Sequence, residues 1–162
     1  MIDDEVKNET VNEEIQNIDL SVFNKKKFSI NGDPDKILEL DVSDLNVVTR
    51  VKEQYPVLAK LADKVSSLSA KVENLSGEEL INETADSLKE IDNEMRACVD
   101  RIFDSNVSEV CVPSGSMYDP INGQFRYEHL INTLIALYDA NLTKEVKKIQ
   151  QRVSKHTAKY TK

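Results

Sequence analysis

The sequence has few of the residues from which most catalytic and cofactor-binding motifs are built. It contains only four glycines and two histidines among 162 residues. The glycines are too scattered to form a phosphate-binding loop or a dinucleotide-binding fingerprint, which need several glycines close together. His129 and His156 lie far apart, so no HExxH or similar zinc-binding pattern is present. We therefore expect neither a metal ion nor a cofactor.

Cysteines and long apolar runs are also scarce. Cys98 and Cys111 are the only cysteines, and they lack CxxC spacing. No stretch approaches the roughly 18 consecutive apolar residues that span a bilayer, and acids stand where a signal peptide would have bases. We therefore expect two reduced thiols in a protein that makes no membrane contact and stays inside the cell that makes it.

One catalytic arrangement remains open on composition alone, a cysteine–histidine pair. Cys98 or Cys111 would have to meet His129 in the folded chain. Packing is the stronger interpretation, because Cys98 falls in the core register of a helix and Cys111 stands between two valines. Buried cysteines are usually inert. We therefore expect no enzymatic activity.

Charge is distributed unevenly along the chain. In total 29 acidic residues outnumber 21 basic ones, which does not favour binding to nucleic acid or to anionic membranes. Residues 1–24 contain seven acids and one base, whereas residues 142–162 contain seven bases and one acid. We expect an acidic flexible tail over 1–24 and a basic C-terminal helix or tail over 142–162. The basic segment has only one aromatic residue, Tyr160, so we favour a role facing a protein partner or the acidic tail over one in nucleic-acid binding.

The segment from Phe28 to Leu40 predicts a β-hairpin. Apolar residues alternate with polar ones on both sides of a turn-forming run, Asn31-Gly32-Asp33-Pro34-Asp35. A lone hairpin is marginally stable in water, so it must pack on the helices that follow.

Apolar residues at helical spacing predict the rest of the domain. We expect Pro56 to end a first short helix and Thr143 to cap a separate basic helix. Residues 113–123 are rich in Pro, Gly, Ser and Asn, a composition that predicts a surface loop. The predicted fold class is mainly α, a small helical bundle with an N-terminal β-hairpin over residues 25–141. The predicted helices cover residues 43–55, 56–75, 77–103 and 124–141, and a last one begins at 143.

Eight residues are candidates for binding a protein partner. An a/d seam of alternating three- and four-residue intervals follows Pro56, and such a seam either builds the chain's own core or docks a foreign helix. The Met–Tyr pair in the loop either anchors a partner or folds back on its own helices. The candidates are Leu58, Leu61, Val65, Leu68, Met117, Tyr118, Leu134 and Tyr138.

The chain has, in this order, the hairpin FSINGDPDKILEL, two long predicted helices, the stretch ACVDRIFDSNVSEVCV and a terminal helix with an apolar face. This layout, over residues 28–141, resembles that of the small tail assembly chaperones of long-tailed bacteriophages. In that stretch the family pattern falls on Asp100, Phe103, Val107 and Val110. The chain departs from the pattern at Asp104, where the family has glycine, and in its longer loop MYDPINGQFRYE.

This resemblance implies a non-enzymatic chaperone of the infected host's cytoplasm that coats the tape measure protein and recruits tail tube subunits. An exposed helix with apolar stripes aggregates unless other apolar helices cover it, and a net acidic surface keeps the complex dispersed. The alternatives are a structural virion protein of the phage head–tail region, or another helical protein-interaction module. Self-association is also expected, because the oppositely charged ends of neighbouring copies attract each other.

Overall fold

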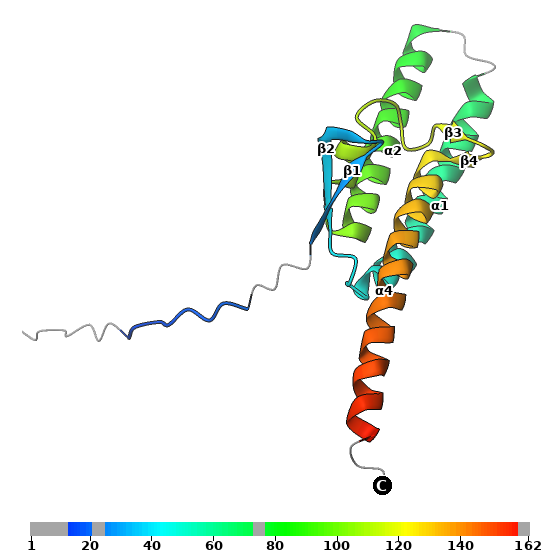
Figure 1. The fold of residues 1–162 in the computed structure, drawn as a ribbon. Helices are drawn as coiled ribbons and strands as arrows, with labels where there is room; N and C mark the ends of the chain where they lie inside the picture. Colours follow the sequence, from blue (N-terminus) through cyan, green and yellow to red (C-terminus); the bar gives the residue numbers. More distant parts are fainter. Residues whose placement is uncertain (1–12, 21–24, 73–76, 159–162) are drawn as a thin grey trace, which may run out of the picture.

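The computed structural model describes residues 13–20, 25–72 and 77–158, and within these ranges it is mainly α with an N-terminal β-hairpin, as predicted. Of the predicted acidic tail it describes residues 13–20, whose side chains are all exposed. The elements, drawn in Figure 1, are β1 (Lys26–Ile30), β2 (Asp33–Leu40), α1 (Asn46–Val72), α2 (Glu78–Phe103), α3 (Val107–Cys111), β3 (Pro120–Ile121), β4 (Gln124–Phe125) and α4 (Arg126–Ala158).

The β1–β2 hairpin forms where alternation predicts it, but its turn is shorter. The strands are antiparallel, with Phe28 opposite Leu38. Only Asn31 and Gly32 form the turn, with φ of 54° and 72°, a left-handed pair that matches the twist of the flanking strands. The following Asp-Pro-Asp residues, predicted as loop, belong to β2. The hairpin packs on α3 through β2.

Helix α1 is continuous through Pro56, so the prediction of two helices divided there is wrong. A proline inside a helix removes one backbone hydrogen bond and costs about 3 kcal/mol. Apolar side chains on both sides of it, Val47 before and Leu58 after, are fully buried. Their burial against the rest of the core outweighs the local cost. Two later positions of the predicted seam, Val72 and Leu75, have side chains outside the described residues.

Helix α2 is the central element of the core. Its predicted bounds, 77–103, agree with the structure. Asp104 ends the helix in the left-handed conformation, with φ of 47°, a conformation common at the end of a helix. In the sequence, Ser76 followed three residues later by Glu79 forms a capping-box pattern, but Ser76 lies outside the described part of the chain. The buried face of α2 comprises Ile91, Met95, Cys98, Val99, Ile102 and Phe103.

Helix α4 is one long helix, so the predicted boundary between 141 and 143 is wrong. Thr143 donates its hydroxyl hydrogen to the carbonyl oxygen of Asp139 (2.9 Å), an interaction made inside a helix and not at its start. No glycine or proline lies nearby to end the helix. Figure 1 shows its last third projecting beyond the other elements.

The segment between α3 and α4 is held by two side chains of α2. Arg96 forms an ion pair with Asp92 (2.8 Å). Its guanidinium also donates to the carbonyl oxygens of Ser108 (3.2 Å), Val112 (2.9 Å) and Gly115 (2.8 Å). The second oxygen of Asp92 accepts the backbone N–H of Met117 (2.7 Å), which fixes the methionine in the core.

The start of α3 is held in a similar way. Both carboxylate oxygens of Asp100 accept hydrogen bonds at 2.7 Å from Ser108, one from the backbone N–H and one from the hydroxyl. Asp100 therefore serves as a remote cap for α3. This contact fixes the start of α3, where the side chain of Val107 is fully buried.

Replacing Arg96 by lysine should lower the free energy of unfolding by about 2 kcal/mol, because lysine cannot reproduce the planar fork of donors. Arg101→Lys on the same helix is the matched control, since Arg101 makes one long hydrogen bond, to Gln54 (3.4 Å). Urea unfolding followed by circular dichroism measures both. Equal losses in the two variants would contradict a special role for Arg96.

Candidate functional site

Most of the predicted partner-binding side chains are used inside the chain's own core. Six of the eight are buried, whereas Leu68 and Tyr118 are half-buried. The buried six belong to one contiguous core cluster, which agrees with the alternative that the seam builds the chain's own core. Two of them, Leu61 and Leu134, also line surface depressions. The six are Leu58, Leu61, Val65, Met117, Leu134 and Tyr138.

The loop that contains Met117 and Tyr118 folds back on the chain's own helices, which was the alternative to anchoring a partner. Met117 is fully buried and tied to Asp92 through its N–H. Its carbonyl oxygen accepts the N–H of Tyr127 (2.9 Å) at the start of α4. Part of the loop also forms the small β3–β4 hairpin, which the sequence did not predict. Asn122 and Gly123 form its turn at φ of 49° and 79°.

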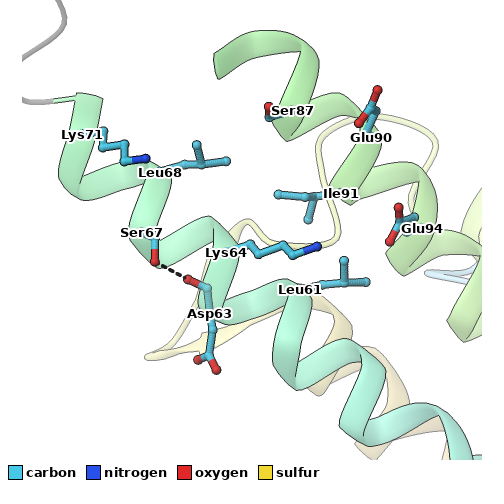
Figure 2. Close-up of a pocket in the computed structure, with 10 residues that line it drawn as sticks. All are labelled: Leu61, Asp63, Lys64, Ser67, Leu68, Lys71, Ser87, Glu90, Ile91 and Glu94. Carbon is cyan, nitrogen blue, oxygen red and sulfur yellow. Dashed lines mark hydrogen bonds between the residues drawn. The ribbon is translucent and has the colours of Figure 1, made fainter. Parts of the chain in front are cut away.

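A first surface depression lies between α1 and α2 near their connected ends, where Figure 1 shows the two helices projecting beyond the other elements. Figure 2 shows Leu61 and Leu68 of α1 on one side of this distal cleft and Ile91 of α2 on the other. The cleft has a volume of about 430 Å³. Lysines on α1 and glutamates on α2 form its rim, so its apolar floor is narrow. The rim residues are Lys64, Lys71, Glu90 and Glu94.

A second and larger depression, the hairpin groove, lies between the β1–β2 hairpin and α4. Its volume is about 650 Å³. Phe28 and Ile30 of β1 line one side, and because they are two residues apart their side chains point to the same face of the strand. Leu130, Leu134 and Leu137 of α4 line the other side and share one helix face.

The apolar side chains that line the hairpin groove keep part of their surface open. Phe28, Ile30, Leu130 and Leu137 are packed on the core but only partly buried. Lys36 and Arg126 add positive charge at the rim.

The end of the groove is closed by the segment after α3, which contributes Val112 and Ser114. Arg126 donates to the carbonyl oxygen of Ser114 (3.0 Å), and Arg96 to that of Val112. The two arginines therefore fix this wall of the groove.

The sequence patterns predict the strand and the helix that carry the lining residues, but not that these two elements form a groove. The pattern placed Phe28 and Ile30 on a strand and the leucines on the apolar face of a helix, and it proposed Leu134 as partner-binding. Which of these residues remain partly open depends on where the hairpin lies relative to α4. That placement follows from long-range packing and leaves no local signal in the sequence.

The third surface is the end of α4, residues 142–158, which we call the C-terminal extension. Val146 and Ile149 are 49% and 51% exposed, about half of each side chain. They continue the helical spacing of the buried face after the supporting elements have ended (Figure 1). Basic residues dominate the rest of this segment. It is an amphipathic helix whose apolar stripe leaves the body of the protein.

The chemistry of the groove does not favour a nucleophilic thiol. Cys111 and His129 both line it. Burial, with a contribution from the charge of Asp100, raises the pKa of the Cys111 thiol to about 11. A catalytic cysteine beside a protonated histidine has a lowered pKa, so the shift runs in the opposite direction. In the part of the chain that the structure describes, no group of three or more His, Cys, Asp or Glu residues is placed to hold a metal ion.

Alkylation of Cys111 in the folded protein should be slow. With its pKa raised to about 11, its thiolate fraction at pH 8 is roughly a hundredth or less of that of an ordinary cysteine. Mass spectrometry of iodoacetamide-treated peptides across pH 7–9 measures the rate, and the urea-unfolded protein is the control. Reaction of Cys111 at pH 7 as fast as in the unfolded chain would contradict this and revive a catalytic thiol.

Comparison of the chain with protein-family models, with curated proteins and with solved structures finds no significant match. Among the described helices, none is both long enough and apolar enough to span a membrane.

Proposed function

We propose that this chain is a non-enzymatic protein-binding module that receives an apolar helix of its partner in the hairpin groove. The observation that carries the proposal is the row of partly buried apolar side chains on both walls, Phe28 and Ile30 facing Leu130 and Leu137. A groove of this kind suits a helix that presents apolar residues at intervals of three and four. Binding gains free energy by removing both apolar surfaces from water.

The positive charges at the rim of the groove favour partners that carry acidic residues. Lys36 and Arg126 lie at the groove, and Arg126 already has an acidic neighbour, Asp119 (3.5 Å). Rim charges mainly steer association and suppress wrong partners, while apolar contacts at the centre provide affinity. A partner helix with acids flanking its apolar stripe fits these charges.

The specific form of the proposal is a tail assembly chaperone of a long-tailed bacteriophage. Its partner would be the tape measure protein, a long helix with apolar stripes that must be covered in the host cytoplasm, and it would recruit tail tube subunits. The resemblance in layout supports this, as does the net charge of −8, which disperses a coated complex. The hairpin and helix that carry the resemblance are the walls of the groove.

A second candidate is a structural virion protein of the head–tail region. The projecting C-terminal extension favours it, because elements that leave the body often join neighbouring copies in a particle. Mass spectrometry of purified particles separates the two functions. A chaperone is absent from the mature particle, whereas a structural protein is present in fixed copy number.

Two substitutions in the groove should weaken partner binding without unfolding the protein. Leu130→Ser with Leu137→Ser removes two partly exposed apolar contacts on one helix face, and we expect roughly a tenfold or greater loss of affinity for a tape measure segment. Val48→Ser with Leu80→Ser is the matched control, since both residues are exposed and lie outside the groove. Titration calorimetry measures the affinities, and thermal melting checks the fold.

Equal weakening by both pairs would overturn the groove as the site. Undiminished binding by the groove pair would do the same, and would point to the distal cleft or to the C-terminal extension. Failure of every variant and of the natural protein to bind the tape measure segment would overturn the chaperone assignment.

A further inference from the structure

Two exposed segments of the chain carry opposite charge. Residues 13–20, the acidic arm, contain three acids and no base. Ile15, Ile18 and Leu20 of the arm are 96%, 77% and 82% exposed, so nearly all of their apolar surface faces water. Figure 1 shows the arm lying clear of the helices. Three large apolar side chains on an exposed segment favour a partner surface that covers them.

The C-terminal extension has the complementary properties. Up to residue 155 it contains five bases and one acid, Glu145, which is paired with Lys148 (3.3 Å). Its apolar stripe includes the half-exposed Val146 and Ile149. Arg152 lies three residues after Ile149 and flanks the stripe, so an acidic segment placed on the stripe comes within reach of its guanidinium.

Charge decides which occupant fits this stripe. Two extensions packed against each other would each bring a net charge of +4, five bases less one acid, and would repel. The arm brings −3 together with its three apolar residues. The hairpin groove is a poorer receiver for the arm, since its rim carries few bases. Among the described segments, the acidic arm therefore complements the extension best.

The lengths of the two segments also agree. The apolar positions of the extension run from Leu142 to Val153, which at 1.5 Å per helical residue is about 16 Å. The arm from Ile15 to Leu20, if extended at about 3.3 Å per residue, spans about 16 Å. An extended arm can therefore cover the whole stripe.

The strand that follows the arm in the chain, β1, begins beside the start of the extension. The ammonium group of Lys26, the first residue of β1, donates to the side-chain oxygen of Asn141 (3.2 Å), which directly precedes the extension. The arm precedes β1 in the chain, and Figure 1 shows it running away from its own extension. Two copies related by a two-fold axis can therefore lay each arm on the other's extension, which closes the assembly at a dimer.

We propose that the acidic arm of one copy docks on the C-terminal extension of a second copy, so that the chain forms a dimer by reciprocal exchange of arms. The contact joins Ile15, Ile18 and Leu20 to the stripe containing Val146 and Ile149, and it sets Glu13 and Glu14 against the basic residues. This dimer leaves the hairpin groove open, so it does not depend on the partner proposed for that groove.

A charge exchange between the two segments tests this proposal on the full chain. The arm variant is Glu13→Lys with Glu14→Lys, and the extension variant is Lys147→Glu with Arg152→Glu. Sedimentation equilibrium at low salt should show a dimer for the natural chain and roughly a tenfold or greater rise in the dissociation constant for each variant alone. The control, Lys52→Glu with Lys60→Glu on exposed positions of α1, should remain dimeric.

Mixing the two variants gives the decisive result. In the mixed dimer one contact joins a natural arm of charge −3 to a natural extension of charge +4. The other joins a substituted arm of charge +1 to a substituted extension of charge 0, which no longer repel each other strongly. The mixture should therefore dimerise more tightly than either variant alone. A natural chain that stays monomeric over the accessible concentrations would overturn the proposal. A dimer that resists both charge reversals, or a mixture that remains monomeric, would overturn it as well. A monomer in which the arm cross-links to its own extension would replace exchange by an intramolecular contact.

Discussion

The ion pair between Arg96 and Asp92 fixes the segment that joins α3 to α4, and this segment forms one wall of the hairpin groove. Their side chains are only 21% and 16% exposed, so their charges are partly removed from water and must be compensated by good geometry. Four backbone groups supply it, three carbonyl oxygens facing Arg96 and the N–H of Met117 facing Asp92. A segment rich in glycine, proline and serine thereby becomes a fixed wall between α3 and α4.

This wall borders the hairpin groove, where apolar side chains of the core remain partly open. The domain uses its best apolar positions to hold itself together, which is why the central residues of the helical seams are buried. Apolar residues remain partly open where two elements cannot close over each other, as at Phe28 and Leu137 in the hairpin groove. Others remain open where a helix outruns its neighbours, as at Val146. We propose that partners bind at such places.

Local sequence patterns predicted the hairpin, α2 and the mainly α class, because alternation and helical spacing are short-range signals. They failed at Pro56, because burial of Val47 and Leu58 in the core outweighs the cost of a proline inside the helix. They also failed at Thr143, because no residue there stops the helix. The candidate site was predictable in its components, such as Leu134, but not in its assembly. The contact between Asp92 and Met117 spans 25 residues, and no spacing rule connects an acid on a helix with a methionine N–H in a later loop.

We propose that the hairpin groove receives an apolar helix from a partner protein. Methyl NMR spectra of the full chain, recorded while a helical segment of the proposed partner, a tape measure protein, is added, show where such a helix binds. We expect the largest shifts at the methyl groups of Ile30, Leu130 and Leu137 in the groove. Saturable shifts confined to Leu61, Leu68 and Ile91 of the distal cleft, with the groove methyl groups unchanged, would show that the helix binds elsewhere.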